Sequence, residues 1–258
     1  MPRAVLGSFF EILTRSEAAA RMVRRFGAPS EIVSVTGPFQ EGAMTLPYKQ
    51  SDRAELAVLL RGRPIWLAAM IQVSELEVVL DSHREVSRLA HRSLLILVPD
   101  DLSDSNSIRN RLDAQGWRYV TWSKGELPSE TTQILLADTR GEMGLWYRLA
   151  PITFMGSSLF SGSLGSDPNE PAAHGSAILY GPNVGRYLRR YSRFADVGAA
   201  RIVRDTETLS GAVQRLIAPD QAAAMAHAAW DVASKGAAVT DRILDMVLDR
   251  LDRLDAAR

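Results

Sequence analysis

Three short apolar runs, each stopped by a turn rich in Gly, Pro, Asp or Ser, constrain the fold of this chain more than any other feature. They are Ile134–Ala137, Ile152–Met155 and Ala177–Tyr180. Short apolar runs bounded by turn residues are typical of strands that are buried on both faces, as in a parallel sheet. We therefore expect three parallel strands whose following turns share one edge of a sheet, the edge at which open α/β sheets bind ligands.

Strands and helices alternate both before and after these runs. Pro64–Met70 and Leu94–Val98 are further expected strands, and between them residues 75–91 repeat apolar positions at helical spacing. This alternation predicts an α/β fold, a Rossmann-like parallel sheet with helices on both faces. The expected segments are a helix plus a strand in residues 1–37, a linker at 38–50, a sheet domain at 51–218 and helices at 219–258.

Composition excludes several classes of function. Thirty basic and thirty acidic side chains leave no net charge, so we expect no nucleic acid partner. The absence of cysteine excludes disulfides, thiolate metal sites and a cysteine nucleophile, and the four histidines show no ligand spacing, so no metal site is expected. No run approaches the ~18 apolar residues of a membrane-spanning helix. We expect a cytoplasmic protein, with peripheral contact to a membrane left open.

Two of the turns also begin helices. Asp138–Glu142 directly follows the first apolar run, and the second run leads through Gly156–Ser158 and a polar loop to Asp167–Pro171. A helix start offers unpaired N–H groups and a partial positive charge, so a phosphate can bind there without a basic side chain. The alternative is that Gly and Ser simply form tight turns and that Asp138 and Asp167 cap the helices.

The order of motifs within residues 133–182 is more specific than any one turn. A DTxGE turn is followed by an apolar helix with a tyrosine, a strand ending in G-S-S-L, a glycine-rich loop, the segment PNEPAAHG, another strand and a GP pair. This order resembles the nucleotide-sugar half of the 3-deoxy-D-manno-octulosonic acid (Kdo) transferases, which are inverting glycosyltransferases of the GT-B fold. The resemblance runs from about Ser16 to about Asp249. It implies that residues 51–218 form the C-terminal, nucleotide-sugar-binding domain of such an enzyme. It also implies CMP-Kdo as the donor, a lipid A precursor in lipopolysaccharide biosynthesis as the acceptor, and no further cofactor.

The resemblance also implies where the donor binds. Three turns at the carboxyl ends of strands should hold it, one after Leu94–Val98, one after Ile134–Ala137 and one in the loop that follows Ile152–Met155. Glu170 matches the position at which a carboxylate accepts hydrogen bonds from ribose hydroxyls. The donor-binding residues expected on this basis are Pro99, Asp100, Arg140, Gly141, Glu142, Ser158, Asp167, Pro168, Asn169 and Glu170.

The sequence departs from the family pattern where positive charge is expected. The family's V-P-R-H turn reads V-P-D-D here, and its G-P-H reads G-P-N. Two carboxylates repel a phosphate, so either a metal ion is held by Asp100, Asp101 and Asp167, or the aspartates form a solvated turn. Arg140 either supplies the lost charge or lies at the surface. His174 is expected to be structural.

The family's general base lies in an N-terminal half that has no counterpart in this sequence, which begins where the donor-binding half begins. We therefore assign no catalytic residue. A partner chain or a second copy would supply the acceptor half, and peripheral contact with the inner membrane is compatible with the resemblance. The alternative is a degenerate, non-catalytic homologue that acts as a binding or scaffold module. The last helix carries an apolar stripe that includes Leu244, Leu248 and Leu251, which would pack on its own domain, on another domain or on a second copy.

Overall fold

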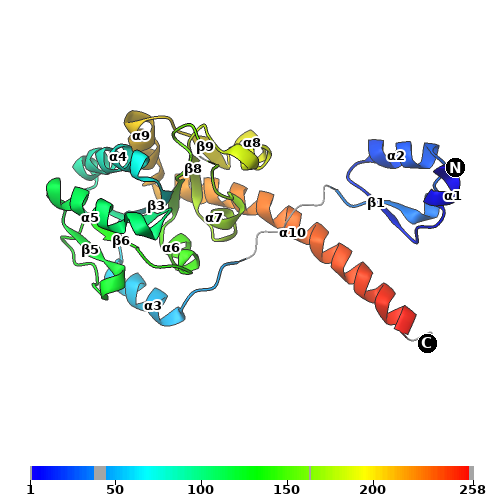
Figure 1. The fold of residues 1–258 in the computed structure, drawn as a ribbon, viewed down its shortest axis with the longest axis horizontal. Coiled ribbons are helices and arrows are strands. Elements are labelled where there is room, and N and C mark those ends of the chain that lie inside the picture. The colour runs from blue at the N-terminus through cyan, green and yellow to red at the C-terminus, as the bar shows by residue number, and fades with distance from the viewer. Residues whose placement is uncertain (1, 38–44, 163, 256–258) are drawn as a thin grey trace. The chain divides into compact units, whose positions relative to one another are not determined.

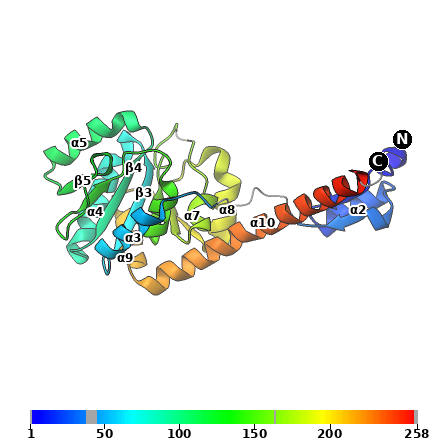
Figure 2. The ribbon, with the colours of Figure 1, turned by 90° about the horizontal axis from the view of Figure 1, so that it is seen from below.

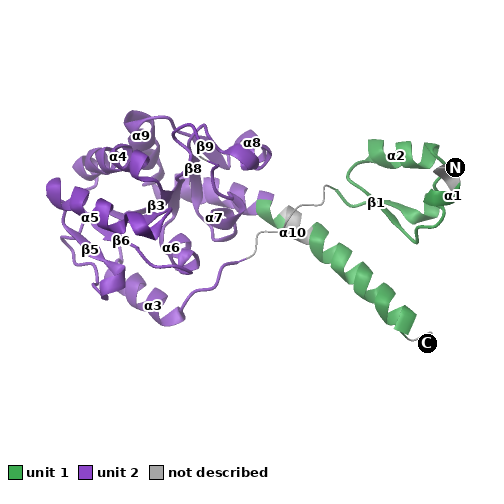
Figure 3. Cartoon of the chain, in the orientation of Figure 1, with its two compact units in different colours: residues 1–43, 233–258 green, residues 44–232 purple. Residues whose placement is uncertain are grey.

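The structure is a computed structural model that describes residues 2–37, 45–162 and 164–255. It divides into two compact units, residues 1–43 with 233–258 and residues 44–232 (Figure 3). The final helix, α10 (Pro219–Asp255), contributes to both units. These units therefore divide the chain at different places from the segments expected from sequence. Of the expected linker, residues 38–44 lie outside the described part.

The larger unit contains a sheet of seven strands, all paired in parallel. Its strand order is β5-β6-β4-β3-β7-β8-β9. The strands are β3 (Ile65–Ile71), β4 (Leu94–Pro99), β5 (Tyr119–Thr121), β6 (Ile134–Leu136), β7 (Ile152–Met155), β8 (Ala177–Tyr180) and β9 (Ala200–Ile202). The predicted α/β class with a parallel Rossmann-like sheet is confirmed.

Successive strands are added first on one side of β3 and then on its other side. Trp66 of β3 pairs with Leu95 of β4 on one side and with Ile152 of β7 on the other. Figure 2 shows β3 and β4 side by side. The chain builds the β4 side first and then crosses to the β7 side, so the gap between β3 and β7 is a topological switch point. The carboxyl ends of strands beside such a point form a crevice.

Helices lie on both faces of the sheet. Helix α4 packs against α9 and α3 packs against α6, and Figure 1 shows the two pairs on opposite sides of the strands. The helices of this unit are α3 (Gln50–Leu59), α4 (Leu76–Leu89), α5 (Ser105–Ala114), α6 (Met143–Leu149), α7 (Asn169–Ala173), α8 (Leu188–Asp196), α9 (Thr206–Leu216) and the first part of α10. No helix in the described residues is both long and apolar enough to cross a bilayer.

The core between α4 and the sheet contains a buried histidine between two tryptophans. The His83 ring stacks on Trp117 with centroids 5.5 Å apart, and the Trp66 indole N–H donates to His83 Nδ1 at 3.1 Å. His83 Nε2 then lies 3.0 Å from the Gln133 carbonyl, to which it donates. A neutral imidazole satisfies both contacts, and burial lowers the pKa of His83 from 6.5 to about 4.

The smaller unit is built on two short parallel strands, β1 (Ile12–Thr14) and β2 (Val33–Val35). They are joined by α2 (Glu17–Arg25), which Ser16 caps by accepting the Ala19 N–H, and α1 (Pro2–Leu6) precedes them. One cluster of buried apolar residues in this unit consists of Ala20, Ala28 and Val33. On α10 the expected apolar stripe is exposed, with Leu244, Leu248 and Leu251 each about half accessible.

Candidate functional site: a cleft at the carboxyl ends of the strands

A cleft of about 450 Å³ lies at the switch point, where β3, β4, β7 and β8 end. We call it the strand-end cleft. Its volume is in the range of small-molecule sites, and its place is the one at which open parallel sheets bind ligands. The polar residues that line it include Gln72, Asp100, Ser157, Asp167, Glu170 and Arg186.

The floor of the cleft carries unusual backbone geometry. Met70 at the end of β3 and Ser157 after β7 have φ values of 55° and 51°, a region that residues other than glycine rarely adopt. The Ser157 hydroxyl donates to the Met70 carbonyl at 3.0 Å, so the two residues support one another. Gly156 makes this approach possible, since a Cβ there would lie 2.6 Å from the Met70 carbonyl oxygen. Such local strain concentrates at functional sites.

Glu75 ties the two sides of the switch point together. Its side chain is fully buried and accepts the N–H groups of Ser157 at 2.7 Å and of Ser158 and Leu159 at 2.8 Å each. It also accepts the Gln72 N–H at 3.2 Å, in a capping box at the start of the short helix Val73–Glu75. The backbone N–H groups of residues 157–159 are thus occupied by the chain's own carboxylate and are not open to an anionic ligand.

Ser158, expected to contact the donor, does not face the cleft. It is fully buried, its hydroxyl donates to the Met155 carbonyl at 2.5 Å, and it accepts the Gly181 N–H at 2.8 Å. Its side chain therefore does not line the cleft, because its polar atoms join the loop after β7 to the turn after β8. No role was predicted for Glu75, although a glutamate at the start of a helix that closely follows a buried strand was a signal.

Glu170 lines the strand-end cleft from α7, as its predicted role requires. The hydroxyl of the buried Tyr147 donates a hydrogen bond to Glu170 Oε2 at 3.3 Å. Burial raises the pKa of Tyr147 well above 10, so the phenol keeps its proton and remains a donor. Burial also raises the pKa of Glu170, and the nearby charge of Asp167 raises it further. Asp167 is itself paired with Arg190 and accepts the Asn169 N–H at 3.0 Å.

His174 supports Glu170 from the far end of the same helix. Its Nδ1 lies 2.6 Å from the Glu170 carbonyl oxygen, and its Nε2 accepts the Leu46 N–H at 3.1 Å. Both ring nitrogens are therefore engaged within the protein, in agreement with the structural role expected for this residue. The contact with Leu46 also fixes the segment that leads into α3.

The remaining predicted residues of the first and third turns divide between the cleft and the interior. Asp100 lies exposed in the cleft after β4. Pro99, Pro168 and Asn169 are buried and do not line it, so they can only shape the site through the backbone. These three side chains lie outside the cleft although each is next to a lining residue in the sequence.

The second predicted turn lies at a separate hollow. Arg140, Gly141 and Glu142 line a pocket of about 360 Å³ together with Tyr48 and Lys49. The Glu142 carboxylate accepts the Trp122 indole N–H at 2.9 Å and also the Thr139 hydroxyl. Arg140 is exposed and does not line the strand-end cleft, so it does not replace the lost charge there.

Two of the three aspartates that could have held a metal are engaged elsewhere. Asp101 accepts the Ser103 N–H at 2.9 Å, and this bond lowers the pKa of Asp101. Asp167 is paired with Arg190. Among the described residues no group of three or more His, Asp or Glu side chains is arranged to hold a metal ion.

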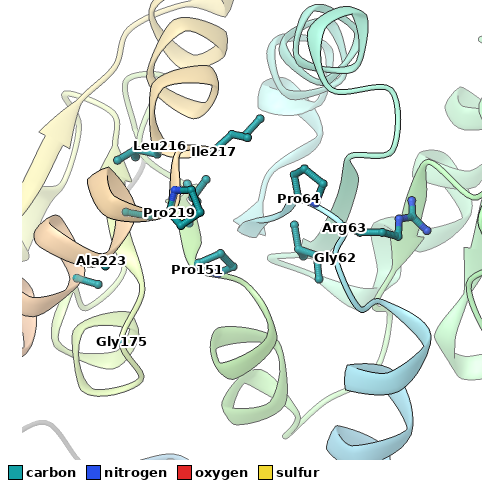
Figure 4. Close-up of a pocket in the computed structure, with 13 residues that line it drawn as sticks. Gly62, Arg63, Pro64, Pro151, Gly175, Leu216, Ile217, Pro219 and Ala223 are labelled. Carbon is teal, nitrogen blue, oxygen red and sulfur yellow. The ribbon is translucent and has the colours of Figure 1, made fainter.

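A further hollow, of about 480 Å³, lies at the opposite edge, where β3 and β7 begin (Figure 4). It is lined mainly by apolar and small residues such as Pro64, Pro151 and Ala223. Its one charged lining residue, Arg63, extends away from Pro151 in Figure 4 and donates to the carbonyls of Arg92, Ser129 and Thr132. The charged side chain of this hollow is therefore used to hold neighbouring backbone segments.

The larger unit has the parallel-sheet fold of the C-terminal domains of GT-B glycosyltransferases, with the strand-end cleft at its switch point. The crystal structure of the C-terminal CMP-Kdo binding domain of WaaA from Acinetobacter baumannii matches 70% of this chain and 96% of that domain, with a TM-score of 0.67 and 22% identity. No family model matches the chain.

Curated relatives place the sequence more narrowly. The chain is 26% identical over 245 residues to the 3-deoxy-D-manno-octulosonic acid transferase of Haemophilus influenzae, covering 94% of this chain and 57% of that protein. It is 28% identical over 259 residues to the enzyme of the same name from Bordetella pertussis, covering 96% and 58%. The chain is thus a relative of the Kdo transferases, and it spans somewhat more than half the length of these two.

Proposed function

We propose that this chain binds a cytidylyl sugar, CMP-Kdo, in the strand-end cleft and serves as the donor-binding part of a Kdo transferase. The observation that carries the proposal is the Glu170 carboxylate on an open cleft at the β3/β7 switch point. Support comes from the relatives named as Kdo transferases and from the fold shared with a CMP-Kdo binding domain.

In this proposal Glu170 accepts hydrogen bonds from the ribose hydroxyls of the nucleotide. A carboxylate accepts two such bonds well only when it is ionised. Tyr147 donates to one oxygen of Glu170 from the buried side, so the other oxygen is left for the ligand. The carboxylate is thus held in one orientation before the donor arrives, which reduces the entropy lost on binding.

Transfer breaks the bond between the anomeric carbon and the phosphate oxygen, forms a bond to an acceptor hydroxyl, and releases CMP and a proton. We assign the groups that bind the acceptor and take this proton to the portion of the relatives that this chain does not match. A longer chain, a partner chain or a second copy would supply that portion. We further propose a lipid A precursor as the acceptor, in lipopolysaccharide biosynthesis, with peripheral contact at the inner membrane.

One observation favours a second candidate, a non-catalytic binding or scaffold module. Three carboxylates, those of Asp100, Asp167 and Glu170, line the cleft, and the N–H groups of residues 157–159 already bind Glu75. Carboxylates near a leaving phosphate oppose the build-up of its negative charge. On this reading the chain binds the nucleotide sugar without transferring it.

Isothermal titration calorimetry with CMP, CMP-Kdo and, as a mismatched nucleotide, AMP tests the proposal. We expect CMP and CMP-Kdo to bind and Glu170→Gln to weaken both at least about tenfold, since a charge-assisted hydrogen bond is lost. Glu55→Gln, an exposed change on α3, is the matched control. Absence of binding at millimolar CMP-Kdo would reject donor binding. Binding without sugar transfer, once an acceptor-binding part is added, would favour the scaffold reading.

A further inference from the structure

The turn after β8 brings an arginine to the strand-end cleft. Arg186 lies in the short helix Gly185–Tyr187 and lines the cleft together with Asp100 and Glu170. Its side chain is exposed, and its guanidinium carbon lies 4.9 Å from the centroid of the Tyr187 ring. Stacking on an aromatic face limits the rotamers of an arginine while leaving its N–H groups open to a ligand.

The backbone holds this turn against the loop that carries Asp167. A Cβ on Gly165 would lie 2.8 Å from the Val184 Cα, and a Cβ on Gly185 would lie 2.9 Å from the Leu164 carbonyl oxygen. Both glycines also have positive φ, 68° and 44°. The two backbones therefore touch at positions where only glycine fits, and Arg186 keeps a fixed place beside the cleft.

Two other arginines do not offer a free charge to the cleft. Arg190 pairs with Asp167, and Arg140 lies at the separate pocket of Tyr48. Within the described part of the chain, Arg186 forms no ion pair with a carboxylate. It is thus a cleft-lining cation whose charge is available to an anionic ligand.

We propose that Arg186 binds the phosphate of the donor nucleotide in the strand-end cleft. The inference rests on the proposed function and adds to it the residue that recognises the phosphate. The positive charge that the family pattern puts after β4 is supplied here from after β8, across the switch point. A guanidinium can donate two parallel N–H bonds to phosphate oxygens, which offsets the repulsion from Asp100.

Comparing CMP with cytidine isolates the phosphate contact. We expect Arg186→Gln to weaken CMP binding about tenfold or more and to leave cytidine binding unchanged. Arg186→Lys should recover part of the CMP affinity, because it keeps the charge but not the paired N–H geometry. Arg189→Gln, an exposed change on α8 that does not line the cleft, should bind both ligands as the wild type does.

The salt dependence gives a second readout. Removing one phosphate contact should flatten the dependence of CMP affinity on salt concentration, whereas a merely structural change would not. Equal CMP affinity in wild type and Arg186→Gln would overturn the inference and leave donor binding standing. An equal loss for CMP and cytidine would also overturn it, as damage to the cleft. A wild type that binds neither ligand would reject the proposed function and the inference together.

Discussion

The Ser158 N–H donates a 2.8 Å hydrogen bond to Glu75 Oε1, joining residues from the carboxyl ends of β7 and β3 across the switch point. Two neighbouring N–H groups make the same kind of bond to this carboxylate. The loop that forms one wall of the strand-end cleft is therefore anchored by a charge buried beneath it. An anion-binding arrangement of N–H groups is used here for structure.

Glu75→Gln is expected to lower the free energy of unfolding by about 3 kcal/mol, because an amide NH₂ would face N–H donors in a buried site. Urea denaturation followed by tryptophan fluorescence measures this. Glu55→Gln, exposed on α3, should change stability by less than about 0.5 kcal/mol. Similar stabilities for the two variants would contradict the anchoring role of Glu75.

Gly181→Ala should be destabilising by roughly 2 kcal/mol or more, since its Cβ would lie 2.2 Å from the Ser158 carbonyl oxygen and a backbone contact cannot yield cheaply. Gly211→Ala is the matched control. Gly211 lies exposed within α9 with no atom within 4 Å of the added Cβ, so alanine should raise stability by about 0.5 to 1 kcal/mol. In thermal unfolding, the melting temperature should fall for Gly181→Ala and rise for Gly211→Ala. Equal changes in melting temperature would refute the close-contact argument.

His83 should make stability depend on pH between about 6.5 and 4. The folded state keeps His83 neutral to about pH 4, whereas the unfolded chain binds this proton near 6.5. The unfolded state therefore binds more protons in this window, and the free energy of unfolding falls as pH is lowered, in total by on the order of 3 kcal/mol. Denaturation at a series of pH values measures the slope.

Two histidine variants separate this effect from other titrations. His83→Asn should be less stable at neutral pH but should flatten the slope, because the group that titrates is gone. His227→Asn, at an exposed position, is the matched control. An unchanged slope in His83→Asn would show that other groups produce it.

Glu170→Gln should separate stability from binding. The raised pKa of Glu170 means that the folded state binds a proton more readily than the unfolded chain, so the ionised carboxylate opposes folding at neutral pH. The neutral variant should therefore be at least as stable as the wild type while losing CMP affinity. A large loss of stability would indicate that Glu170 serves the fold.

The same shift predicts the pH dependence of CMP binding. As pH falls, Glu170 takes up a proton earlier than an ordinary glutamate with a pKa of 4.5, and the protonated acid accepts hydrogen bonds less well. As the pH is lowered, the wild type should therefore begin to lose CMP affinity while the pH is still above 4.5. Calorimetry at several pH values would check this, and Glu170→Gln should not show this part of the change.

Local sequence patterns predicted the sheet well because buried parallel strands leave a clear trace. Ile152–Met155 and Ala177–Tyr180 match β7 and β8 in both bounds. Helix α8 and strand β1 were not predicted. The order of the strands could not be predicted, because it depends on pairing between segments that are far apart in the sequence.

The candidate site was harder to predict than the fold. Turn residues could be identified, but the direction of each side chain depends on partners far away in sequence. Ser158 turned inward to Gly181, and Arg140 lies at another pocket. Glu75 and Arg186 reach the site from turns whose role appears only when the strands are assembled.

The central place of β3 also has a consequence for synthesis. β3 is the first strand of the seven-stranded sheet in chain order, yet one of its two neighbours is β7, the fifth. While the chain emerges from the ribosome, one edge of β3 keeps its N–H and C=O groups unpaired until residues up to Met155 have left the exit tunnel. Nascent chains that stall before that point expose an apolar strand edge, so this unit depends on uninterrupted translation or on a chaperone more than a sheet of sequential neighbours would.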